Sequence, residues 1–424
     1  MRVPALIFGL LTVSLVGSPA DEHPAWSVAF RAETRLIHDT NVFLQNEAPL
    51  AAGQSVRGEP VLAAATELIA SLSVVAKRSP STPDGLAAEI GYGFEWHRFD
   101  AFRAESHVDH RLTASLREST GAWLTEAKVS ALETVGSNES PIYNEQGGVP
   151  AIGGEPVRAR RAQTVVNATG SALWRTAGTL RLRGSFAALS QDFHTRHEAA
   201  TAGCANYVDR AQAIAGIDAG RALAGDLTAW FSLRAGRQWQ ANLLNRTDNF
   251  TNTVVRPLVG LEGRLTPTLR LTAWAGPDFH RFTSERRAGT DAARVLPFVE
   301  ANAVWEPAKT DRVTLGGREQ LWLGSGGRSA YREFRGDAAW AHRFSPALDA
   351  ALRFSAQHGN FSGFAATPRN DQIFSAAVAL GEEITRAVHL DASLTREWTQ
   401  TRIPATAGRA YERWLASLGA TRSW

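Results

Sequence analysis

Residues 86–97 read LAAEIGYGFEWH, and this stretch decides the fold class because apolar residues occupy every second position. One face carries Leu86, Ala88, Ile90, Tyr92, Phe94 and Trp96, and the other carries Ala87, Glu89, Gly91, Gly93, Glu95 and His97. A period of two is that of a β-strand, whereas a helix with one apolar face repeats its apolar residues about every 3.6 positions. The stretch therefore predicts a strand with one apolar and one polar face.

The same alternation recurs along the chain from residue 26 onward. It predicts about 18 strands of bilayer-crossing length, beginning near residues 26, 62, 86, 106, 122, 161, 178, 209, 226, 253, 268, 294, 311, 332, 347, 371, 387 and 410. The segments 62–76 and 209–222 are rich in alanine and alternate least clearly, so about 16 strands is an open alternative.

The connections between these strands alternate in length. Short, turn-like connections occur at 118–121, 175–178, 266–268, 306–311, 344–347 and 385–386, and longer ones at 37–60, 134–160, 191–208, 239–252, 282–293, 359–370 and 400–408. A membrane barrel has short periplasmic turns and long outer loops. A β-propeller is the main rival, but it lacks this parity and its repeated Trp-Asp signature is not found. The fold class expected is all-β, a transmembrane up-and-down antiparallel β-barrel.

The first 20 residues have the features of an export signal. Arg2 precedes an apolar run at Ala5–Val16, and small residues follow at Ser18 and Ala20. The run is shorter than the roughly 20 apolar residues that span a bilayer as a helix. We expect a signal peptide at residues 1–20 and a single barrel domain at 21–424, in the outer membrane of a Gram-negative-type bacterium.

Aromatic residues lie at the predicted strand ends. Those beside long connections are Trp96, Trp239 and Trp398, and those beside short turns are Trp174, Trp305 and Trp424. Tryptophan rings favour the headgroup depth of a bilayer, so this arrangement predicts two aromatic girdles in contact with outer-membrane lipid. The alternative is that aromatic residues end strands in any β protein.

The segment that ends at Trp424 alternates clearly. Trp414, Ala416, Leu418, Ala420 and Trp424 share one parity, and Arg422 interrupts it. The segment resembles the C-terminal recognition strand of outer-membrane barrels. That resemblance implies recognition by the barrel-assembly machinery, and we expect Arg422 to extend toward the headgroups.

Residues 38–43, His-Asp-Thr-Asn-Val-Phe, follow the first predicted strand. They resemble the Asp-x-Asn-Val-Phe stretch of the type 2 family of bacterial outer-membrane β-barrel porins, some members of which are linked to exopolysaccharide gene clusters. The resemblance implies an outer-membrane location and a porin-like channel, and it brings no catalytic or substrate residues.

The polar parity gives a set of candidate pore-lining residues: Arg181, Arg183, Arg234, Arg256, Arg264, Arg270, Glu262, Asp278, Arg318, Arg335 and Arg353. Such a lining favours water and solutes, and charged rings tune ion selectivity. The alternative is that these charges pair across strands and only support the wall. The excess of arginine at 181–183 and 256–270 suggests a preference for anions.

A barrel of this size encloses an aqueous channel. We therefore expect passive diffusion of small hydrophilic solutes or ions, with the segment 134–160 as the best candidate for a constriction. A non-conducting or gated barrel that serves exopolysaccharide export or envelope structure is the alternative. Whether the barrel forms a homo-oligomer stays open.

Other classes of function find little support. Lys+Arg 45 against Asp+Glu 42 is near balance, which does not indicate a nucleic-acid partner. Cys204 is the single cysteine, so no internal disulfide or thiolate metal site can form. His194 and His197 lie in a predicted outer loop without fitted carboxylates, and no nucleotide or metalloprotease motif occurs. We expect no enzyme activity, no cofactor and no metal.

Overall fold

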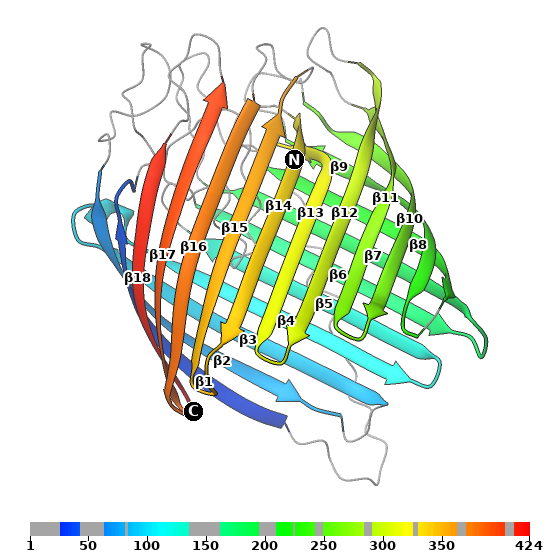
Figure 1. Cartoon of the computed structure of the whole chain (residues 1–424). Coiled ribbons are helices and arrows are strands. Elements are labelled where there is room, and N and C mark those ends of the chain that lie inside the picture. The colour runs from blue at the N-terminus through cyan, green and yellow to red at the C-terminus, as the bar shows by residue number, and fades with distance from the viewer. Residues whose placement is uncertain are drawn as a thin grey trace.

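The computed structural model describes residues 26–42, 63–80, 84–134, 162–194, 209–223, 225–241, 249–283, 291–324, 330–362, 370–402 and 411–424. They form one sheet of 18 strands (Figure 1). The strands are β1 (Trp26–Asp39), β2 (Ala65–Arg78), β3 (Gly85–Phe99), β4 (His107–Thr120), β5 (Trp123–Thr134), β6 (Gln163–Arg175), β7 (Leu180–Phe193), β8 (Arg210–Ala222), β9 (Thr228–Gln240), β10 (Asn252–Thr266), β11 (Leu269–Phe282), β12 (Ala293–Ala308), β13 (Asp311–Leu323), β14 (Ala330–Arg343), β15 (Leu348–Asn360), β16 (Asn370–Thr385), β17 (Val388–Arg402) and β18 (Glu412–Ser423), and a short 3-10 helix, η1 (Arg103–Glu105), follows β3.

Each strand pairs antiparallel with its neighbours in sequence, and β1 also pairs with β18. The sheet is therefore a closed up-and-down barrel, which confirms the predicted fold class. The Ala-rich segments form β2 and β8, so the alternative of 16 strands is wrong. No helix among the described residues is long and apolar enough to cross a membrane.

The two ends of the barrel differ in their connections. At the turn end, which is the lower end in Figure 1, connections are as short as residues 121–122, 267–268, 309–310 and 386–387. At the loop end they are mostly longer, and the two shortest are residues 324–329, between β13 and β14, and residues 100–106, which join β3 to β4 through η1. The predicted signal peptide at 1–20 and nearly all of the segment 134–160 lie outside the described residues.

Large apolar side chains cover the outer surface of the barrel. Among the most exposed are Ile217 at 73%, Leu418 at 64% and Val259 at 62%. The buried side chains of the strands are largely polar, and Asp218, Asp278 and Glu397 are 0% exposed. This is the reverse of a water-soluble globular protein, in which apolar residues fill the interior.

The seam between β1 and β18 is fastened at both ends. At the turn end, Phe30 and Trp424 exchange two backbone hydrogen bonds of 3.3 and 3.0 Å. At the loop end, Arg413 lies 3.2 Å from the Asp39 carboxylate, and the Asn41 amide donates to the Glu412 carbonyl at 3.0 Å. The residues that resemble the porin motif therefore help to close the barrel, while Phe43 lies outside the described residues.

The loop end of the β13–β14 hairpin contacts the inner wall of the barrel at β8 and β9. The Gln240 amide on β9 donates to the Gly324 carbonyl at 2.8 Å, and Arg210 on β8 donates to the Leu323 carbonyl. Leu321 and Leu323 pack in one buried cluster with Phe250, Phe282 and Ala330. Since β8 and β9 are not neighbours of β13 in the sheet, these contacts bring the hairpin against a distant part of the inner wall.

Candidate functional site

The inner face carries every candidate pore-lining residue. They lie on β7 (Arg181, Arg183), β9 (Arg234), β10 (Arg256, Glu262, Arg264), β11 (Arg270, Asp278), β13 (Arg318), β14 (Arg335) and β15 (Arg353). Their cross-strand partners follow one parity: Arg183 faces Asp218, Arg264 faces Arg270, and Arg318 faces Arg335. Side chains directly opposite in neighbouring strands share a face of the sheet. Because some of these residues are buried inside the barrel, the register shows that the others face inward as well.

Three of these arginines lie over inward-facing aromatic rings on β9, β11 and β12, and we call this group the Arg–aromatic patch. Its members are Arg183, Arg234, Arg256, Trp230, Trp274 and Phe298. The Arg183 guanidinium carbon lies 4.5 Å from the Trp230 ring centroid, and that of Arg234 lies 4.8 Å from the Trp274 centroid. Both distances are within the range of an attractive cation–π contact.

Glycines make room for the two indole rings. The inner-face register runs from Gly220 on β8 to Trp230 on β9, Gly260 on β10 and Trp274 on β11. A Cβ atom on Gly220 would lie 2.4 Å from the Trp230 ring, and one on Gly260 would lie 2.5 Å from the Trp274 ring. Each ring therefore lies over the backbone of a neighbouring strand, which larger residues would prevent.

Carboxylates neutralise two arginines of the patch. Arg183 lies 2.7 Å from both Asp218 and Glu262. Arg256 lies 2.8 Å from Asp278, whose other oxygen lies 2.9 Å from the His280 ring. These charges support the wall in the way that the pairing alternative expects.

Arg234 differs from these two arginines. Among the described residues it makes no ion pair within 4.0 Å, although Asp218 and Glu300 contribute to the potential around it. Arg181, Arg270 and Arg353 likewise form no ion pair in the described part of the chain. By contrast, Arg318 lies 3.0 Å from Glu333, and Arg335 lies 3.1 Å from Asp337. The exposed Arg264 lies 3.8 Å from Asp226. Among the candidate residues, the arginines without an ion pair in the described part of the chain are thus Arg181, Arg234, Arg270 and Arg353.

The predicted girdle residues lie on the outer face. Trp96, Trp239 and Trp398 lie near the loop end together with Trp414, and Trp174, Trp305 and Trp424 lie near the turn end together with Trp26, Trp123 and Trp340. Trp123 and Trp174 stack with ring centroids 6.1 Å apart, and Trp398 stacks on Phe374 at 5.6 Å. Trp230, Trp274 and Trp322 have the opposite parity and face inward.

A second group of inward side chains, His97, His107 and Asp109, was not predicted from the sequence. His97 on β3 and His107 on β4 are directly opposite in the register, and Asp109 is the next inward residue of β4. The short 100–106 connection fixes this register, and its length was a signal that could have located the pair. Asp100 helps to hold the connection, since its carboxylate accepts from the Thr66 and Ala101 backbone N–H groups, which lower its pKa.

Of the outer-loop residues considered earlier, only His194 is described, and its ring lies 3.0 Å from the Thr164 hydroxyl. Residues 195–197 and Cys204 lie outside the described residues.

The described residues define a class of protein: a closed antiparallel barrel of 18 strands with an apolar outer face and a polar inner face. No protein-family model matches the chain, so membership of the type 2 porin family stays a prediction. No curated protein matches it in sequence.

Several solved structures have a backbone fold similar to that of this chain. The outer membrane protein OpdK of Pseudomonas aeruginosa is similar at 12% identity and a TM-score of 0.43, over 94% of this chain and 99% of that one. OccAB3 of Acinetobacter baumannii is similar at 11% identity and a TM-score of 0.45, over 94% of this chain and 100% of that one. The copper transporter OprC is similar at 11% identity and a TM-score of 0.43, over 96% of this chain and 82% of that one. At these values the similarities assign neither a function nor a residue role to this chain.

Proposed function

We propose that the protein is an outer-membrane channel through which small hydrophilic solutes or ions diffuse. The single observation that carries this proposal is the division of the closed barrel into an apolar outer face and a charged inner face. A closed barrel satisfies all backbone hydrogen bonds in lipid, and outward apolar residues are those that lipid solvates.

Tryptophans at both ends of the outer face support a membrane location, because their rings favour the headgroup depth. In this proposal the tryptophan sets at the two ends are the two girdles, and Trp424 belongs to the strand that the barrel-assembly machinery would recognise. Both assignments are parts of the proposal, as is the role of the inner-face residues in lining a pore.

We further propose a preference for anions, and assign it to the arginines that form no ion pair among the described residues, of which Arg234, midway along β9, is the one to test first. Arg183 and Arg256 are compensated by carboxylates within 2.8 Å, whereas Arg234 has no ion pair among the described residues. A fixed positive charge in a low-dielectric wall raises the local concentration of anions.

The first experiment is to record single-channel currents of the refolded protein in a planar bilayer. We expect stepwise currents that grow with salt concentration, and a reversal potential in a salt gradient that indicates anions as the main carriers. Arg234→Gln should shift this potential toward cations. Arg237→Gln is the matched control, because Arg237 lies on the same strand and faces outward.

Two results would contradict the proposal in different ways. A folded, heat-modifiable barrel that never conducts would exclude passive diffusion and favour the export or structural alternative. A conducting barrel that selects cations would overturn the anion preference alone. A selectivity that Arg234→Gln leaves unchanged would overturn the role of Arg234 in that preference.

A further inference from the structure

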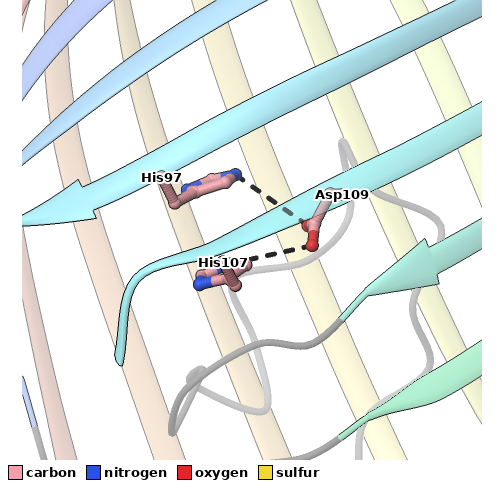
Figure 2. Close-up of side chains that lie close together, drawn as sticks. All are labelled: His97, His107 and Asp109. Atoms are coloured by element: carbon pink, nitrogen blue, oxygen red, sulfur yellow. Dashed lines mark ion pairs between the residues drawn. The ribbon is translucent and has the colours of Figure 1, made fainter. Parts of the chain in front are cut away.

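A cluster of potential metal ligands lies on the inner face near the loop end of the barrel. His97 comes from β3, and His107 and Asp109 come from β4 (Figure 2). One ligand atom from each residue lies within 4.8 Å of the other two. The side chains of His97, His107 and Asp109 are 11%, 3% and 12% exposed, so the cluster is largely shielded from bulk water.

The distances within the cluster are unlike those of direct hydrogen bonds. His97 Nε2 lies 3.9 Å from Asp109 Oδ2, and His107 Nε2 lies 3.7 Å from Asp109 Oδ1. Direct N–H···O bonds are about 2.7–3.2 Å long. Ligands around one tetrahedral zinc ion, with bonds of about 2.0–2.1 Å, are separated by roughly 3.4 Å. Each imidazole nitrogen therefore needs to approach Asp109 by only a few tenths of an ångström. The ligand atoms of all three residues lie within 4.8 Å of one another, so the widest pair needs to close by up to about 1.4 Å to share an ion.

The opposite nitrogen of each imidazole is already held. His97 Nδ1 lies 2.6 Å from the Glu67 carboxylate on β2, and His107 Nδ1 lies 2.7 Å from the Glu105 carbonyl in η1. When Nδ1 of a neutral histidine donates its proton to an acceptor, Nε2 presents its lone pair. Such contacts orient metal-binding histidines and fix their tautomer.

The two rings also have a fixed relative position. Their centroids lie 4.3 Å apart and their planes differ by 7°, so the rings stack in parallel. Figure 2 shows the two imidazoles one above the other, with the Asp109 carboxylate to one side of both and a dashed line from each ring to it. Glu95 Oε2 lies 3.6 Å from His97 Nε2 and supplies a further carboxylate within reach.

We propose that His97, His107 and Asp109 bind a divalent transition-metal ion of the zinc type, with Glu95 or a water molecule as a fourth ligand. Two imidazole nitrogens and a carboxylate suit Zn²⁺ and its neighbours in the first transition row, whereas Ca²⁺ and Mg²⁺ prefer oxygen ligands alone. Glu67 is a positioning residue in this site, because it acts on His97 from the far side of the ring. We expected no metal from the sequence, and we replace that expectation with this site.

The test is zinc binding by the full barrel refolded in detergent, measured by competition with a chromogenic zinc chelator. We expect one tight site per barrel, and at least about a tenfold loss of affinity in each of His97→Gln, His107→Gln and Asp109→Asn. Glu67→Gln should weaken binding roughly 10- to 100-fold, as loss of a supporting carboxylate does in other metal sites. Magnesium in excess should not compete.

His110→Gln is the matched control, because His110 lies on the same strand and faces outward, where its ring contacts Tyr92. It should bind zinc as the unaltered protein does. Heat-modifiable migration would confirm that each variant is folded, and Co²⁺ uptake followed by its visible absorption gives a second readout of nitrogen and oxygen coordination. The proposal is overturned if the unaltered barrel takes up no zinc, or if folded His97→Gln and His107→Gln variants bind it as tightly as His110→Gln.

Discussion

Arg256 and Arg264 have the same side chain and lie on the same strand, yet their surroundings give them different energetic roles. Arg256 is 4% exposed and contacts Asp278, which is 0% exposed. The side chains of Arg264 and Asp226 are 55% and 73% exposed and lie 3.8 Å apart. Burial makes a missing partner costly, because the remaining charge cannot be hydrated, whereas water screens an exposed pair.

We predict that Asp278→Ala destabilises the barrel by about 3–5 kcal/mol, because it leaves Arg256 as an uncompensated buried charge. The measurement is urea-induced unfolding in lipid vesicles, followed by tryptophan fluorescence. Asp226→Ala removes the partner of Arg264 and should change the free energy of unfolding by less than about 1 kcal/mol. Equal stability of the two variants would contradict this assignment.

At the scale of elements, the hairpin of β13 and β14 is the clearest departure from a plain wall of strands. Its upper end is held by side chains from β8 and β9, and Leu321 is 0% exposed. Arg210 itself is held in place by two contacts. Its Nε–H donates to the Gln191 side-chain oxygen at 2.7 Å, and its guanidinium lies over the Trp322 ring. We therefore propose that this hairpin narrows the channel, while the segment 134–160 lies almost wholly outside the described residues and stays a prediction.

We predict that Arg210→Met increases the single-channel conductance and the open-channel noise. The hairpin would lose its hydrogen bond at the Leu323 carbonyl, and its upper end would move more freely relative to β8. The planar-bilayer recording described above measures both quantities. Arg237→Met, on the outer face of β9, should leave them unchanged. A conductance identical in the two variants would show that the hairpin does not limit the current.

Most of the elements could be predicted from the sequence, because alternation and the parity of connection lengths are local signals. The largest displacement is at β2, expected near residue 62 and found to begin at Ala65. The inner set of charges was also predictable from parity. The ion-pair partners of these charges were not all predictable. Arg183, for example, contacts Glu262, and these two residues lie on strands that are not neighbours in the sheet. The contact of the β13–β14 hairpin with β8 and β9 escaped prediction for the same reason.

At the scale of the whole molecule, the barrel has its apolar surface on the outside, and its stability should depend on where lipid meets it. A charge placed at the centre of a bilayer is costly, and the cost falls toward the headgroups. Ile217 lies midway along β8, whereas Leu180 is the first residue of β7 at the turn end, and both face outward.

We predict that Ile217→Arg destabilises the barrel by about 2–4 kcal/mol in lipid vesicles, and Leu180→Arg by about 1 kcal/mol or less. Reversible unfolding in vesicles of defined thickness measures both. Two variants with the same stability would place the membrane midplane away from Ile217 and would weaken the proposal of a membrane-spanning barrel.

The pairing of β1 with β18 has a further consequence, which concerns the order of the strands in the chain. In a sheet that closes on itself every strand has a neighbour on both sides, so no strand is an edge strand. Trp26 and Trp424 lie at the same end of the barrel, and the backbone of Phe30 is hydrogen-bonded to Trp424. A short linker could therefore join these ends, and the chain could be opened in another connection without the loss of a single strand pair. In a circular permutant of this kind the same barrel would form from a different starting strand, with every strand keeping both of its neighbours.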